Sequence, residues 1–115
     1  MSTDCLFCRI VAGELPSTKV HEDDLVLAIR DIAPRSPVHI LLMPNRHIAS
    51  ALDLTDEDSP VVGRIFSVAA DLARSEGIAD AGYRLVSNVG TWGGQSVDHL
   101  HIHLMGGRAF RWPPG

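Results

Sequence analysis

The sequence predicts an α+β domain in which about five antiparallel strands form one sheet, accompanied by one long and one short helix. Short strand-like segments lie on both sides of a single long amphipathic helix, and they do not alternate with helices as βαβ units would. The chain has 115 residues, a length at which single domains are common, so residues 1–115 are expected to form one domain. No internal repeat or linker argues for a second domain.

The first half of the chain supplies the short helix and three of the strands. Residues 5–12 carry apolar side chains at helical spacing and should form the short helix. Strands are expected at residues 18–22 and 25–30, separated by an acidic turn, and at residues 38–43 after a proline-rich break. The acidic residues of the turn are expected to form a solvated surface.

The long helix is expected over residues 55–77. Thr55 can cap its start, and the acidic residues that follow complement the helix dipole. Pro60 is tolerated in a first turn, which also allows the helix to start at Ser59. The apolar stripe of this segment is typical of a helix packed on a core, and Gly77 suits the position after the last turn.

The most informative segment is the last predicted strand, residues 99–104, which follows a strand at residues 83–87 and a glycine-rich loop. His99, His101 and His103 alternate there with leucine and isoleucine. Successive side chains of a strand point to opposite faces, so the imidazoles should share one face and the aliphatic side chains should face a core. Such a row of histidines suits proton transfer, attack on phosphorus or metal binding. An exposed strand with inert histidines is the alternative.

Composition and charge limit the possible partners. The chain is 45% hydrophobic and 21% charged, as in ordinary globular proteins. Its formal net charge of -4 argues against a nucleic-acid partner, which would require clustered lysine and arginine, but allows a small ligand with a phosphate. The N-terminus lacks the pattern of a signal peptide, and no apolar segment approaches the length of a membrane helix. A cytoplasmic protein with no membrane partner is therefore expected.

The histidine segment contains the groups that nucleotidyl transfer requires. This chemistry needs a neutral imidazole as nucleophile, partners that hold its tautomer, and donors for the phosphate oxygens. His101 can attack while His99 and His103 hold it and donate to the substrate. Ser96 and the amides of the glycine-rich loop can hold non-bridging oxygens. Attack would leave a nucleotidyl-histidine, which water must hydrolyse in a second step.

Two motifs near the C-terminus resemble those of a known family. Residues 94–108 read GQSVDHLHIHLMGGR and resemble the signature of the histidine triad (HIT) family. Residues 112–115 read WPPG and are similar to the end of its Hint-like branch. The resemblance extends over nearly the whole chain, from Asp4 onward. It implies a HIT-like fold and a hydrolase that cleaves purine nucleoside 5′-phosphoramidates or acyl-nucleotides.

Two other functions remain open at this point. One is a dinucleoside polyphosphate hydrolase of the same family. The other is a zinc-stabilised module that binds a nucleotide or a protein partner with little turnover. The third histidine, His103, argues against a nucleotidyltransferase, because the transferase branch of the family has a pattern with glutamine at this position.

The resemblance also implies roles for individual residues. His101 would be the nucleophile, and His99 and His103 would orient it and bind the phosphate. His39 would hydrogen-bond within the triad, and Ser96 would help to protonate the leaving group.

The same resemblance implies a set of residues that bind the nucleotide. Asp31 would accept hydrogen bonds from both ribose hydroxyls. An apolar slot would hold the base without hydrogen bonds to it, and loop residues would contact the phosphate. These contacts are expected at Ile32, Asn88, Leu6, Phe7, Ile10, Ile29, Gln95, Ser96, Val97, His101 and His103.

Cys5 and Cys8 are too close in sequence for a useful disulfide, and their spacing suits a metal or redox pair. The resemblance to bacterial HIT proteins adds His47 and His99, which completes a Cys₂His₂ set of the kind that holds structural zinc. A catalytic zinc is not expected, because four protein ligands leave no open position. Two reduced cysteines packed in the core are the alternative.

Relatives in this family form homodimers whose two sheets join into one. The resemblance therefore implies a homodimer with a sheet continued across it and a C-terminal tail that reaches the partner's site. Trp112 would then be an interface residue, and its alternative is a tail aromatic folded on its own core.

Overall fold

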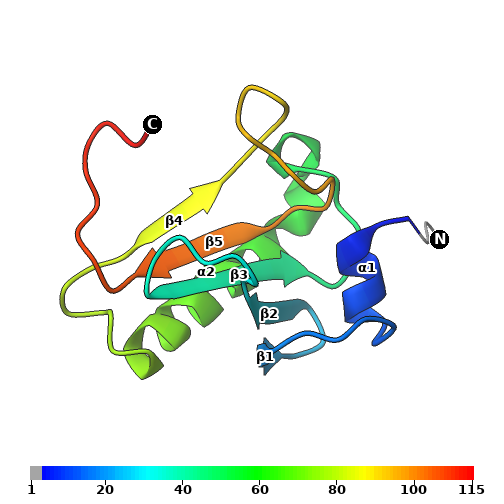
Figure 1. Ribbon diagram of the computed structural model, residues 1–115. Helices are drawn as coiled ribbons and strands as arrows, with labels where there is room; N and C mark the ends of the chain where they lie inside the picture. Colours follow the sequence, from blue (N-terminus) through cyan, green and yellow to red (C-terminus); the bar gives the residue numbers. More distant parts are fainter. Residues whose placement is uncertain (1–3) are drawn as a thin grey trace.

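A computed structural model describes residues 4–115 of the chain (Figure 1). Five strands form one sheet in the order β1-β2-β3-β5-β4, and every neighbouring pair is antiparallel. The predicted α+β class is therefore confirmed. In chain order the elements are α1 (Leu6–Val11), β1 (Lys19–Glu22), β2 (Val26–Arg30), β3 (Val38–Pro44), two short 3₁₀ turns (Ala51–Asp53 and Asp56–Asp58), α2 (Ser59–Ser75), β4 (Arg84–Ser87) and β5 (Ile102–Gly106).

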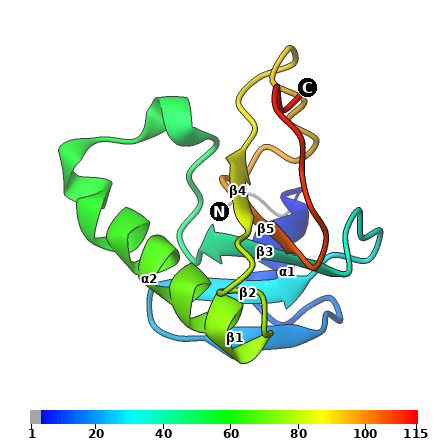
Figure 2. The same ribbon diagram turned by 90° about the vertical axis from the view of Figure 1, so that its left-hand side faces the viewer.

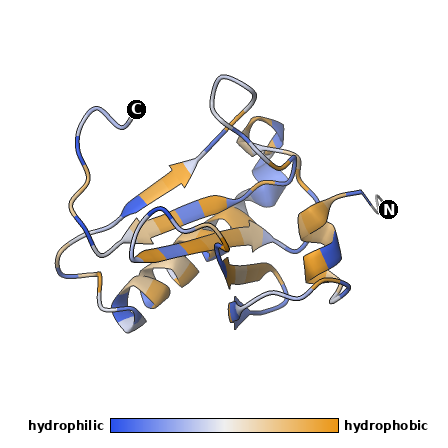
Figure 3. Cartoon of the chain, viewed as in Figure 1, coloured by the Kyte–Doolittle hydropathy of each residue, from blue (hydrophilic) through white to orange (hydrophobic). Residues whose placement is uncertain are grey.

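The sheet has a core on each of its faces. In the view turned by 90°, α2 lies against one face of the sheet and α1 lies on the other side (Figure 2). β2 and β3 are buried along most of their length because both of their faces are covered, and they are mostly hydrophobic (Figure 3). On the α2 side Ile40 and Leu42 pack with Ile65 and Val68 of the helix. The core on the α1 side consists of Phe7, Ile10, Leu27, Ile29, Leu41 and Met43.

The long helix begins at Ser59, the later of the two predicted starts. Before it, Asp56–Asp58 form a 3₁₀ turn rather than α-helix. The backbone amide of Thr55 donates to the Asp58 carboxylate, and the Asp58 carboxylate also pairs with Arg46. Asp58 is buried, and these donors supply the hydrogen bonds that a buried carboxylate needs. The acidic segment is a helix start, as expected.

The acidic turn between β1 and β2 does more than face solvent. Asp23 accepts hydrogen bonds from the backbone amides of Leu25 and Val26, both at 2.8 Å. Its other carboxylate oxygen lies 2.9 Å from Nε of Arg64 on α2 and 2.6 Å from Nε2 of His21. The expectation of a merely solvated acidic pair was wrong for Asp23, which fixes the hairpin and ties it to the helix.

The histidine strand is shorter than predicted, because β5 begins at Ile102 instead of His99. β3 pairs with β5 only as far as Leu42 opposite Ile102. Two residues further along β3 is Pro44, which has no amide hydrogen to extend the ladder. The amide of Leu100 donates instead to the carbonyl of Ile48 at 2.6 Å. The prediction that the aliphatic side chains of this segment face the core is nevertheless confirmed, since Leu100, Ile102 and Leu104 are buried on the α2 side.

The C-terminal tail leaves β5 and runs beside β4, where Nη2 of Arg84 donates to the carbonyl of Arg111 at 2.8 Å. Trp112 is 85% exposed, so the alternative in which it folds on its own core was wrong. Within residues 4–115, no helix is both long and apolar enough to cross a membrane.

Candidate active site and metal centre

A cleft of about 380 Å³ lies between α1 and the sheet, within the range usual for small-molecule sites. α1 supplies one wall, and β2, β3, β5 and the end of the glycine-rich loop supply the others. Its lining residues are Leu6, Phe7, Ile10, Leu15, Pro16, Ser17, Ile29, Arg30, Asp31, Ile32, Leu41, Ser96, Val97, His101 and His103. The apolar end is shaped by α1 side chains packed on the sheet, and the polar end contains two of the three histidines.

The tautomer of His101 is fixed by the backbone. Its Nδ1 lies 2.7 Å from the carbonyl oxygen of His99. A carbonyl only accepts hydrogen bonds, so Nδ1 carries a proton, and in the neutral tautomer Nε2 has the lone pair. The ring is 5% exposed, and Phe7 packs edge-on against it with ring centroids 5.0 Å apart. In a neutral His101 ring, Nε2 is therefore the nitrogen available as a nucleophile.

His39 and His103 form a chain of hydrogen bonds with one consistent direction. The backbone amide of Arg35 donates to Nδ1 of His39 at 3.0 Å, so a neutral His39 carries its proton on Nε2. That Nε2 lies 2.9 Å from Nδ1 of His103 and donates to it. His103 must then carry its own proton on Nε2. Because His103 lines the cleft, its remaining N–H is a donor suited to a phosphate oxygen.

Asp31 lies beside this chain at the end of β2. One carboxylate oxygen accepts the backbone amide of Ala33 at 2.8 Å, and the other lies 3.4 Å from Nε2 of His39. The backbone amide of Asp31 donates to the carbonyl of His39 at 3.0 Å, which fixes the position of the residue. Asp31 also lines the cleft, so it can accept further hydrogen bonds from a ligand.

Burial keeps both histidines of this chain neutral near neutral pH. It lowers the pKa of His103 to about 4, and the nearby His101 and His39 lower it further while Asp31 opposes the shift. Burial also lowers the pKa of His39, against the opposing effect of Asp31. Neutral rings are required for the directed chain described above.

A pH dependence of stability follows from His103. Its pKa is about 4 in the folded protein against an ordinary value of 6.5, so between these values the unfolded chain binds more protons. The stabilising contribution is complete above pH 6.5 and is lost as pH falls toward 4. Between pH 7 and pH 5 we expect His103 to account for a loss of about 2 kcal/mol. Urea unfolding of the wild type and His103→Gln at both pH values measures it, and equal losses in both proteins would contradict it.

The glycine-rich loop contributes to the cleft through its last residues only. Ser96 and Val97 line it, whereas Asn88 and Gln95 do not. Nδ2 of Asn88 donates to the carbonyl of Gly93 at 2.7 Å, across the loop. The side chain of Gln95 bonds three backbone groups, at Gly90, Ala49 and Val97. These hydrogen bonds shape the loop, and contact of Asn88 and Gln95 with the nucleotide stays a prediction.

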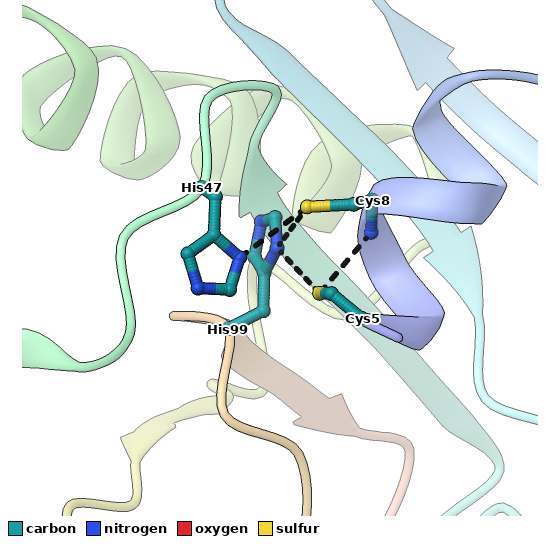
Figure 4. A group of neighbouring side chains, drawn as sticks. All are labelled: Cys5, Cys8, His47 and His99. Carbon is teal, nitrogen blue, oxygen red and sulfur yellow. Dashed lines mark hydrogen bonds between the residues drawn. The ribbon is translucent and has the colours of Figure 1, made fainter. Parts of the chain in front are cut away.

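Cys5, Cys8, His47 and His99 come together as the sequence predicts (Figure 4). Their ligand atoms all lie within 4.8 Å of one another. The Sγ atoms of Cys5 and Cys8 lie 3.3 and 3.5 Å from Nδ1 of His99, and Sγ of Cys8 lies 3.3 Å from Nδ1 of His47. A tetrahedral zinc site has sulfur-to-nitrogen separations of about 3.6 Å, given its usual bond lengths. The cluster is therefore compatible with structural zinc.

Protonation supports the same assignment. Nε2 of His99 lies 2.9 Å from the carbonyl of Pro44 and must donate to it, which leaves the lone pair of Nδ1 facing the two sulfurs. Burial, with a contribution from Cys5, raises the pKa of Cys8 to about 11. Two thiolates side by side thus require a nearby cation. Held there, a zinc ion would neutralise the thiolates and link α1 to the loop after β3.

Asp31, His39 and His103 also bring possible ligand atoms within 4.8 Å of one another. The hydrogen bonds argue against a metal ion there. Nδ1 of His39 already accepts the amide of Arg35, so ligation through Nε2 would require a ring without any proton. We therefore interpret this group as part of the hydrogen-bond chain.

Several cleft residues were not expected from the sequence. Leu41 lies two residues after His39 on β3, so strand alternation could have placed it on the same face. Arg30 directly precedes Asp31, but its guanidinium makes a bidentate ion pair with Glu76. Leu15, Pro16 and Ser17 belong to the connection between α1 and β1, which has no pattern that predicts a position.

The comparisons with known proteins identify the family. The HIT domain model matches residues 12–110, and the chain belongs to this family. It is similar to a purine nucleoside phosphoramidase of Escherichia coli, with 47% identity over 108 residues that cover 94% of this chain and 91% of the relative. A 14 kDa zinc-binding protein of Brassica juncea is 46% identical over 114 residues, covering 97% and 100% of the two chains.

A solved structure agrees in fold. The crystal structure of a HIT family hydrolase from Legionella pneumophila Philadelphia 1 superimposes with a TM-score of 0.96 and 51% identity. The match covers 97% of this chain and 100% of that one. The expected HIT-like fold and family are thereby confirmed.

Proposed function

We propose that this chain, acting as a single domain, is a hydrolase that cleaves purine nucleoside 5′-phosphoramidates or acyl-nucleotides through a nucleotidyl-His101 intermediate. The observation that carries this proposal is the hydrogen bond from Nδ1 of His101 to the His99 carbonyl, which makes Nε2 the nucleophilic nitrogen of the neutral ring in the cleft. The similarity to the E. coli purine nucleoside phosphoramidase supports the substrate class.

The cleft suits a nucleoside monophosphate group from end to end. A base would enter the apolar slot between α1 and the sheet, against Phe7, Ile10 and Ile29. Ile32 is 99% exposed and would cover the base from the rim. The carboxylate of Asp31 would accept the ribose hydroxyls, and the phosphate would then lie beside His103 and Ser96. The slot supplies apolar contact, so we expect weak discrimination among purines.

The chemistry takes two displacements. Nε2 of His101 attacks phosphorus, a P–N bond forms to the imidazole, and the bond from phosphorus to the leaving group breaks. The leaving amine or carboxylate departs with its electron pair, and Ser96 passes a proton to an amine. Water then attacks phosphorus and gives up a proton, which restores the hydroxyl of Ser96 after an amine has left or passes to solvent after a carboxylate has left. The P–N bond to His101 breaks with its electron pair returning to Nε2, and a nucleoside monophosphate is released.

Neighbouring histidines assist these steps without forming covalent bonds. The Nε2–H of His103 would donate to a non-bridging oxygen, where negative charge increases as the nucleophile attacks. His39 holds His103 in the required tautomer through the hydrogen bond at 2.9 Å. Since the ring of His99 belongs to the metal cluster, we assign its catalytic part to its carbonyl, which orients His101.

We further propose a cytoplasmic homodimer in which the sheet continues from one protomer to the other. β4 lies at the end of the strand order and leaves one edge free for pairing. The exposed Trp112 lies on the tail that runs beside this strand. Both features support contact with a partner at this edge.

The substrate class is tested by comparing kcat/KM for adenosine 5′-phosphoramidate and for a diadenosine polyphosphate. We expect a preference of at least about 100-fold for the phosphoramidate, which corresponds to about 3 kcal/mol in the transition state. The reverse preference would favour a dinucleoside polyphosphate hydrolase. Nucleotide binding without turnover of either compound would favour the zinc-stabilised binding module.

A further inference from the structure

The metal cluster and the nucleotide cleft share two parts of the chain. One is His99, whose ring belongs to the cluster and whose carbonyl holds the nucleophile. The other is α1 with its N-cap Cys5, because this short helix carries Cys8 of the cluster and also cleft side chains. Neither connection is needed for a metal that only stabilises the fold.

The first connection passes through the main chain of His99. Its ring is fully buried and held at both nitrogens, by the Pro44 carbonyl on one side and by the sulfur atoms on the other. Because the ring cannot rotate without breaking these contacts, the backbone that carries it is also fixed. Its carbonyl therefore points steadily at Nδ1 of His101, 2.7 Å away.

The second connection passes through α1. Sγ of Cys5 accepts the backbone amide of Cys8, which caps the first turn of this six-residue helix. Between the two cysteines lie Leu6 and Phe7, and both line the cleft. Phe7 packs edge-on against His99 and His101, with ring centroids 5.8 and 5.0 Å away. A helix this short is not stable alone, so its position depends on the cluster and on its packing.

We propose that metal binding at the Cys5, Cys8, His47 and His99 cluster positions the nucleophile and the base slot, so that metal and nucleotide bind cooperatively. This inference rests on the proposed function, since it takes the cleft as the nucleotide site. Coupling of this kind is reciprocal: the factor by which zinc strengthens nucleotide binding equals the factor by which the nucleotide strengthens zinc binding.

Calorimetric titration with AMP tests the coupling on the full chain, zinc-loaded and after treatment with a chelator. We expect AMP to bind at least about fivefold more tightly to the zinc-loaded form, the lower end of the usual range for coupled sites. Zinc affinity should rise by the same factor when AMP is present. Circular dichroism tests whether the zinc-free form remains folded.

The His47→Ala variant supplies the measurement if zinc-free protein unfolds. His47 is exposed and lies outside the cleft, so its loss weakens metal binding without removing a nucleotide contact. Added zinc should lower the Kd for AMP in this variant too. The decrease should require higher zinc concentrations than in the wild type. His21→Ala is the matched control. His21 lies on β1, its ring pairs with Asp23, and it belongs to neither site. It should behave as the wild type.

Histidine ¹⁵N spectra distinguish positioning from general stabilisation. With zinc bound, His101 should be protonated on Nδ1 only, and without zinc it should exchange between both neutral tautomers. His103 is the internal control, because His39 and not His99 fixes its tautomer. It should show Nε2 protonation in both forms.

Three outcomes decide the proposal. Tighter AMP binding together with a zinc-dependent His101 tautomer supports it. An AMP affinity that changes less than twofold, with an unchanged His101 tautomer, overturns the coupling and leaves the proposed function intact. Absence of AMP binding in both forms overturns the proposed function as well.

Discussion

Replacement of His101 by alanine is expected to lower kcat by at least about 10⁴-fold, because no other group in the cleft offers a nitrogen lone pair in a fixed position. The lone pair of His99 Nδ1 faces the sulfur atoms of the cluster, and the lone pair of His103 Nδ1 accepts the hydrogen bond from His39. Nucleotide binding should persist, since the base slot and Asp31 are unchanged. The measurement is steady-state turnover of a fluorogenic adenosine 5′-phosphoramidate, with AMP affinity determined by calorimetry.

His21→Ala is the matched control for this variant, because it also removes one imidazole but from outside the cleft. It should retain full turnover. Turnover by His101→Ala within tenfold of the wild type would contradict covalent catalysis by this residue. Loss of both turnover and AMP binding would show that the substitution damages the cleft, and His101→Asn, which keeps a polar side chain of similar reach, would then be compared.

The largest expected effect on stability is that of the double substitution Cys5→Ala with Cys8→Ala. A ligand present at about 1,000 times its Kd stabilises the folded state by about 4 kcal/mol. For a domain of this size, such a loss lowers Tm by roughly 15–20 °C. The two cysteines are only partly buried, so the substitution creates little cavity, and the loss comes mainly from the metal, with a smaller part from the cap that Cys5 provides to α1. Thermal unfolding followed by circular dichroism, with zinc and with chelator, separates the contribution of the metal from that of the substitution itself.

The zinc dependence is the informative comparison. Chelator should lower the Tm of the wild type to near that of the double variant, and added zinc should leave the variant unchanged. Equal Tm values for the wild type with and without zinc would contradict a structural metal. A variant that loses stability but still responds to zinc would place the ion on other residues.

The sequence predicted the sheet well, for a physical reason, and the clustering of Cys5, Cys8, His47 and His99 was expected from the family resemblance. Strand alternation depends only on local geometry, and it correctly placed Leu100, Ile102 and Leu104 in the core. The start of β5 depends instead on distant residues. Pro44 of β3 ends the ladder, and the carbonyl of Ile48 accepts the amide of Leu100. No local pattern around His99 carries that information.

The hydrogen bonds that Asn88 and Gln95 make to the backbone could not be predicted, for a similar reason. Both are polar residues of a glycine-rich loop, and such residues can face a ligand or the loop itself. Which of these occurs depends on where the backbone carbonyls of Ala49 and Gly93 lie, and those positions are set by the folded loop. The tautomer of His39 likewise depends on the turn that brings the Arg35 amide to it.

The stereochemical course at phosphorus tests the central claim most directly. The substrate is an adenosine phosphorothioate analogue of the phosphoramidate, with known configuration at phosphorus, hydrolysed in ¹⁸O-labelled water. Attack by His101 and then by water gives two in-line displacements, each with inversion, so the account predicts net retention. Net inversion would mean a single direct attack by water, and would contradict a nucleotidyl-His101 intermediate.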